Sequence, residues 1–252
     1  MAQIDWLMEF ESSLEPDECV VSVVSSGGID AVVLHLYILT YLWTSSNHVY
    51  VMLQKPGGSV DMYNITKFIR VLQTKFNDPL IGAKVAITLC IGGNDFIPKF
   101  YGMSHDKYLT TMLTDNFRDR LFILKNDRLR LSESVFVDYV QALFCPKALK
   151  SSQRTFEEVQ EATREMTRRS KPNLHDIFDS TVRDARQWLP PKSAVLKLAE
   201  LVNLQIDYMD LAGSNDAVMS TIKSASCFKA EDREVEFNFG PDCHITSFQN
   251  IV

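Results

Sequence analysis

Two aspartates that follow glycine pairs are the side chains of this chain best suited to metal chemistry. Asp30 ends the stretch VVSSGGID, and Asp95 lies in GGNDF. Loops at the carboxyl ends of strands are where α/β sheets bind ligands, and glycine lets such loops turn sharply. Two carboxylates can hold Mg²⁺, which polarises a phosphodiester and activates water. Asp30 and Asp95 are therefore candidate magnesium ligands. The alternative is that Asp30 caps a helix and Asp95 caps a turn or a helix.

The first half of the chain alternates strand and helix patterns. Runs of β-branched residues bounded by turn residues predict strands over 18–26 and 48–53. A dense apolar run predicts a helix starting near Asp30, and apolar residues at helical spacing predict a second over 65–76. A third is predicted from Pro79, a favourable first helical residue, to the glycines at Gly92 and Gly93. This alternation predicts an α/β fold with a parallel sheet and flanking helices.

Beyond Phe100 the strand signal fades and helical patterns predominate. Val235, Phe237 and Phe239 alternate with polar residues, which predicts an extended segment in the tail. The sequence therefore predicts a partial α/β module over 1–113 and a mainly helical C-terminal region with a short extended tail over 114–252. The helices predicted in this half are 105–113, 132–144 with Ser132 at its start, 155–170 and 194–206.

The segment LCIGGNDFIPKFYGMSHDKYLTTML resembles the C-terminal half of the nuclease module of the flap-endonuclease/XPG and 5′→3′ exonuclease superfamily, which has a PIN-like fold. Gly93 to Phe96 match that family's G-[SNC]-D-[YF] element, whose Asp binds metal. Upstream, VVSSGGIDAVVLHLYI resembles the segment that carries D-x-D at a strand end, with Asp30 as the second Asp. The later WLPPKSAVLKLAELVNLQIDYM is similar to a segment of uncharacterised, transposon-associated animal proteins.

The resemblance implies a degenerate metal site. Gly28 stands where the family's first Asp of D-x-D is expected, and the resemblance covers only 18–113. Hydrolysis by two metals needs two cations about 4 Å apart that clamp the attacking and leaving oxygens. Asp30 and Asp95 alone can neutralise at best one Mg²⁺. We therefore expect catalysis to be lost or incomplete, with any further ligands supplied by another chain.

The same resemblance implies contact with nucleic acid. YGMSHDKYLTTML aligns with the first part of the family's helix–turn–helix, which contacts duplex phosphates through backbone amides and lysines. Lys99 and Lys107 take that role in the alignment, with Arg118 beyond them. Ser104 and His105 replace the glycine and proline of the family's turn. Whether the partner is DNA or RNA stays open.

Composition narrows the remaining classes of function. A net charge of −6 argues against strong non-specific binding to nucleic acid, although 96–130 holds seven bases against four acids. No apolar run approaches the roughly 20 residues of a membrane span, and the start lacks the pattern of a signal peptide.

Five scattered cysteines without a CxxC pair predict reduced thiols in an intracellular protein, either nuclear or cytoplasmic. His35, inside an apolar run, is predicted to be a core histidine.

Three hypotheses follow from the sequence. The first is a degenerate relative of Mg²⁺-dependent structure-specific nucleases that binds nucleic acid or a protein partner. The second is an active metal-dependent phosphodiesterase completed by another chain or by a missing N-terminal half. The third is a helical interaction protein unrelated to nucleases.

Overall fold

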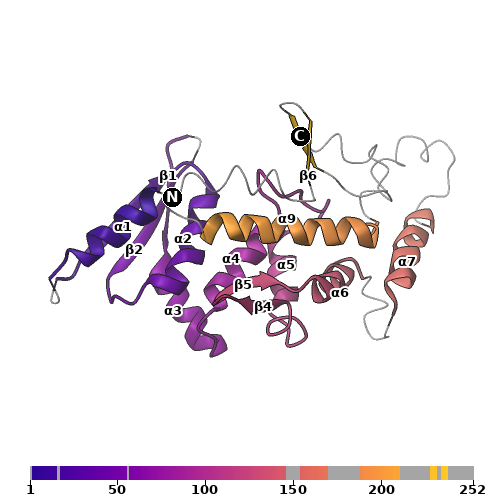
Figure 1. Cartoon of the computed structure of the whole chain (residues 1–252), viewed down its shortest axis with the longest axis horizontal. Helices are drawn as coiled ribbons and strands as arrows, with labels where there is room; N and C mark the ends of the chain where they lie inside the picture. Colours follow the sequence, from indigo (N-terminus) through magenta and orange to yellow (C-terminus); the bar gives the residue numbers. More distant parts are fainter. Residues whose placement is uncertain are drawn as a thin grey trace. The chain divides into compact units, whose positions relative to one another are not determined.

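The computed structural model describes residues 2–15, 18–55, 57–145, 154–169, 188–210, 228–231 and 234–237 (Figure 1). These residues form two compact units. The first contains the described residues up to Cys90 together with Gln205–Asp210, and the second contains Ile91–Leu204 and the described residues after Ile222. Among the described helices, none is both long and apolar enough to cross a membrane.

The first unit is built on a three-stranded sheet in the order β1-β2-β3. β1 (Val21–Ser26) pairs in parallel with β2 (His48–Gln54), which confirms both predicted strands. β3 (Val60–Asn64) pairs antiparallel with β2, so the α/β class is confirmed but the sheet is mixed rather than parallel. The chain reverses between β2 and β3 at Gly57 and Gly58, whose φ angles of 92° and 84° favour glycine.

Helices α1 (Ala2–Ser12), α2 (Ile29–Leu42), α3 (Ile65–Phe76) and α4 (Ile81–Ile91) complete this part of the chain. α2 and α3 pack on β2 and on each other, and the buried side chains of the sheet are Ser22, Val24, Val49 and Val51. A Cβ on Gly82 would collide with the Thr40 hydroxyl, so α4 approaches α2 closely at this glycine.

Helices α3 and α4 begin at or near the predicted positions. α3 agrees with the predicted 65–76 helix, and Asn64 caps it by accepting a hydrogen bond from the Lys67 amide. α4 begins at Ile81 rather than at Pro79, because Asp78 accepts from the Leu80 amide and holds the preceding residues in a turn. α1 was not predicted from the sequence.

A hydrogen bond distant in sequence fixes the end of α9 (Lys192–Asp210) in the first unit. The Tyr37 hydroxyl on α2 donates to Asp210 Oδ1 at 2.7 Å. Tyr37 is fully buried, and burial, reinforced by neighbouring Tyr41 and Asp210, raises its pKa far above the usual value. The hydroxyl therefore stays protonated and serves as the donor in this contact.

His35 lies in the core of the first unit, as predicted. Its side chain is completely buried, and its Nδ1 lies 2.7 Å from the Ala31 carbonyl oxygen. Nε2 has no hydrogen-bond partner in the structure. Burial disfavours the charged ring and lowers the pKa of His35 below its ordinary value of 6.5.

We expect His35 to make the folded state sensitive to acid. The unfolded chain takes up a proton on this ring near pH 6.5, whereas the folded chain resists doing so. The stability that depends on this group is therefore fully present above pH 6.5 and is lost as the pH falls toward the lower pKa of the folded state. In that window the free energy of unfolding falls by up to about 1.4 kcal/mol per pH unit. Urea unfolding at several pH values between about 5 and 7 measures this dependence. The free energy of unfolding should depend less steeply on pH in His35→Leu than in the original sequence. An unchanged slope, or an equal change in the exposed control His105→Gln, contradicts this assignment.

The second unit combines helices with short hairpins. It contains α5 (His105–Met112), α6 (Glu133–Phe144), α7 (Phe156–Arg169) and α9 as far as Leu204, which confirms the helices predicted in this half. β4 (Phe122–Lys125) and β5 (Arg128–Leu131) form an antiparallel hairpin that was not predicted. β6 (Phe228–Glu231) pairs with β7 (Glu234–Phe237), which confirms the extended tail as far as Phe237; Phe239 lies outside the described residues.

Two buried tyrosines anchor the segment before α5. Tyr108 and Tyr139 are fully buried, and the Tyr139 hydroxyl donates to the Tyr108 carbonyl at 2.8 Å. The Tyr108 hydroxyl accepts from the Phe100 amide at 3.3 Å, and burial raises the pKa of Tyr108 to about 12. Phe100 also packs edge-on against Phe144 of α6. The chain around residues 100–108 is therefore fixed to the core of this unit.

Candidate functional site

Asp30 lies in the first turn of α2. The helix begins at Ile29 and its N-cap is Gly28, with extended backbone and no side-chain cap, so the prediction that Asp30 caps the helix is wrong. A carboxylate in the first turn still stabilises the helix through the positive end of its dipole. Burial, and after it the charge of Asp30, raises the pKa of the Cys90 thiol to about 12. Asp30 therefore lies near the end of α4 within the first unit.

Asp95 lies in a turn that is organised by its neighbour. Asn94 Oδ1 accepts from the amides of Phe96 and Ile97, both at 2.9 Å, and the Asn94 amide donates to the Ile97 carbonyl at 3.1 Å. The alternative prediction was that Asp95 caps this turn. In the structure Asn94 caps it instead. Asp95 itself is exposed.

Gly93 makes this turn possible. Its φ is +101°, a conformation that side chains with a Cβ rarely adopt. A Cβ built on Gly93 would lie 2.6 Å from Lys99 Cβ and 3.1 Å from Lys99 Cα. The chain after Asp95 therefore folds back directly onto Gly93, which brings Lys99 beside the turn.

The two predicted metal ligands belong to different units of the structure. Asp30 belongs to the first unit and Asp95 to the second. In the described part of the chain, no group of three or more His, Cys, Asp or Glu side chains is arranged to hold a metal ion. Mg²⁺ can be held by one or two carboxylates, but it then keeps most of its water shell and depends on substrate phosphates for further ligands.

The predicted basic residues divide into two kinds. Lys99 and Lys107 are exposed, and Lys107 lies in the first turn of α5, whose N-cap Ser104 accepts from the Lys107 amide at 3.4 Å. The Arg118 guanidinium lies 3.4 Å from the Asp119 carboxylate and 3.6 Å from that of Asp115, and its side chain is only 24% exposed. The two lysines thus share one segment with Asp95, whereas the charge of Arg118 is offset by neighbouring acids.

Two exposed aromatic rings in this segment were not predicted as site residues. Phe96 is 72% exposed and Tyr101 is 44% exposed. Both rings therefore present apolar surface to solvent within one segment of the chain. We call the segment Gly93–Lys107, with Phe96, Lys99, Tyr101 and Lys107 on it, the aromatic–basic loop. The sequence signal was present, because KFYG places Lys99 and Tyr101 two residues apart.

Comparisons of this chain with protein-family models, with curated proteins and with solved structures find no match.

Proposed function

We propose that this protein binds nucleic acid through the aromatic–basic loop, as a degenerate relative of Mg²⁺-dependent structure-specific nucleases. The observation that carries the proposal is the exposure of Phe96, at 72%, and Tyr101, at 44%, beside the exposed Lys99 and Lys107. The hydrogen bonds of Asn94 and the buried Tyr108 hold the ends of this loop in place. A loop whose ends are held in place loses less conformational entropy when it binds.

The arrangement fits unpaired bases better than a smooth duplex. Bases stack on exposed aromatic rings with about 1–3 kcal/mol each, and lysines of the same segment neutralise the phosphates of the bound strand. Asp95 and Asp106 lie in the same loop and oppose phosphate binding. We therefore expect moderate affinity that falls steeply with salt, with single strands or frayed ends preferred.

Binding of fluorescent single-stranded DNA, single-stranded RNA and duplex DNA, followed by polarisation at several salt concentrations, tests this proposal. Phe96→Ala should weaken binding about ten-fold or more, because it removes one stacking ring. Lys99→Glu/Lys107→Glu should weaken binding and reduce the salt slope by about 1.4, since two phosphate contacts are lost. The DNA and RNA arms distinguish the two partners.

The chain offers matched controls for both variants. Leu124→Ala removes another exposed apolar side chain, 63% exposed, from the same unit. Lys67→Glu/Lys125→Glu makes the same change in net charge at two exposed lysines outside the loop. Equal losses in variants and controls, or no binding to any of the three nucleic acids, contradict the proposal. Hydrolysis in Mg²⁺ or Mn²⁺ that Asp95→Asn abolishes would replace it with an active phosphodiesterase.

A further inference from the structure

β1 is an edge strand of the sheet formed by the described residues, since β2 is its only neighbour in that sheet. The Val20 carbonyl accepts from the His48 amide at 3.4 Å, so the polar backbone groups of Val20 face β2. Because backbone groups along a parallel strand alternate in direction, those of Val21, Val23 and Ser25 face away from β2. Val21 and Val23 are also exposed, at 59% and 47%.

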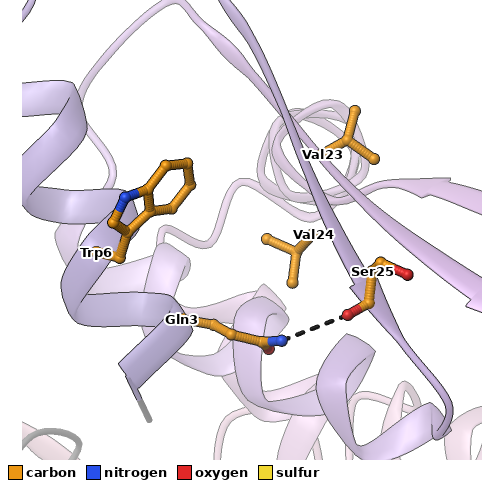
Figure 2. A pocket seen from close by; sticks show the side chains of 5 residues that line it. All are labelled: Gln3, Trp6, Val23, Val24 and Ser25. Atoms are coloured by element: carbon orange, nitrogen blue, oxygen red, sulfur yellow. Dashed lines mark hydrogen bonds between the residues drawn. The ribbon is translucent and has the colours of Figure 1, made fainter.

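Only one described hydrogen bond uses this outer side. The Gln3 side-chain amide on α1 donates to the Ser25 carbonyl at 3.4 Å, at one end of the strand (Figure 2). Among the described residues, no hydrogen bond uses the outward groups of Val21 and Val23. Proteins usually protect such an edge with Lys or Pro, but β1 has the sequence VSVVSS and contains neither.

A pocket of about 330 Å³ lies between α1 and this edge. It is lined by Gln3 and Trp6 of α1 and by Val23, Val24 and Ser25 of β1. Figure 2 shows Val24 pointing toward α1, Val23 pointing away from it, and Gln3 reaching across to Ser25. Trp6 stacks on Phe10 at 5.4 Å and is still 55% exposed. The edge strand is thus accompanied by an apolar pocket with an aromatic wall.

α1, which lines one side of the pocket, is acidic. α1 carries Asp5, Glu9 and Glu11 and no basic residue. Asp5 and Glu9 are exposed, and Glu9 follows Trp6 by three residues, about one helical turn. A ligand that binds beside α1 is therefore favoured if it carries basic side chains.

We propose that the groove between α1 and the outer edge of β1, the β1 groove, binds an extended basic–apolar peptide of a partner protein. The peptide adds a fourth strand to the sheet by exchanging backbone hydrogen bonds with Val21 and Val23. One apolar side chain enters the pocket between Trp6 and Val24, and Lys or Arg side chains face Asp5 and Glu9. In strand addition of this kind, main-chain bonds supply affinity and the pocket supplies specificity. This inference is independent of the proposed binding of nucleic acid.

The experiment uses the full chain and a short fluorescein-labelled peptide in which Lys and Val alternate around one central Leu. We expect saturable binding by fluorescence polarisation. Trp6→Ala should weaken it about ten-fold, since aromatic anchors dominate such interfaces. The control Phe68→Ala removes another exposed ring, 46% exposed, from α3 of the same unit and should leave binding unchanged. Asp5→Lys/Glu9→Lys should also weaken binding and remove its salt dependence.

Two modified peptides separate strand addition from simple charge attraction. A peptide N-methylated on alternate backbone amides cannot pair with Val21 and Val23 and should not bind. A peptide with Glu in place of Lys should bind far more weakly. The proposal is overturned if the peptide shows no saturable binding, if N-methylation or Trp6→Ala leaves affinity unchanged, or if the groove is occupied by a second copy of the chain. The last outcome would appear as concentration-dependent dimers that Val23→Lys dissociates.

Discussion

Replacing Asp78 with Ala is expected to lower the free energy of unfolding by about 3 to 5 kcal/mol, because it removes one partner of a nearly buried ion pair. Asp78 Oδ2 lies 2.7 Å from Lys84 Nζ, and the two side chains are only 15% and 10% exposed. Removing the carboxylate leaves a nearly buried ammonium without the charge that faces it. The substitution also removes the acceptor of the Leu80 amide, so the turn before α4 loses a hydrogen bond.

Urea unfolding followed by circular dichroism measures this effect. Adding Lys84→Met to Asp78→Ala should recover much of the loss, because no buried charge then remains. The control is Asp61→Ala, which breaks the ion pair with Lys55 at 2.6 Å on the surface, where the side chains are 37% and 52% exposed. Its effect should be much smaller, because solvent screens the pair. Similar losses at both aspartates, or no recovery in the double variant, would refute this account.

Gly93→Ala is expected to lower the free energy of unfolding by about 3 kcal/mol and to abolish binding to the aromatic–basic loop. Two causes add. A φ of +101° strains any residue with a Cβ, and the new methyl group would press on Lys99 Cβ at 2.6 Å. The turn must then open, which displaces Phe96 and Lys99 together.

Gly102 provides the matched control for this prediction. Its φ is also positive, at +71°, but a Cβ there would meet nothing within 4 Å. Gly102→Ala therefore introduces backbone strain without the collision and should cost about 1 kcal/mol. Thermal unfolding and polarisation of a bound oligonucleotide should be measured on both variants. Equal losses of stability at Gly93 and Gly102 would show that the contact with Lys99 is not tightly packed.

The elements that the sequence predicted correctly have strong local signals. The 65–76 helix repeats its apolar residues at helical spacing and starts at a capping Asn64. The β4–β5 hairpin lacked such a signal, since each strand has four residues and four side chains form too short a pattern. Its turn places Asn126 and Asp127 at φ angles of 52° and 58°, as in a type I′ turn, but without the glycine that usually announces one.

The candidate site was predictable in position but not in chemistry. Consecutive glycines at the end of an apolar run indicated the turn that holds Asp95. That Asn94 rather than Asp95 organises this turn, and that Gly28 rather than Asp30 caps α2, depends on backbone angles that residue types alone do not determine. The exposure of Phe96 depends on which other elements of the unit pack over this turn. A phenylalanine in the same motif could equally be buried in a core, so the motif does not predict its exposure.

The hydrogen bond between Tyr37 and Asp210 has a consequence for the order in which the chain folds. It joins residues separated by 173 positions, and the first unit needs Gln205–Asp210 in addition to its first 90 residues. During synthesis, the strands and helices up to Cys90 are made on the order of ten seconds before Asp210. Over that interval the Tyr37 hydroxyl lacks its acceptor, so the first unit reaches its final stability only after most of the second has been translated.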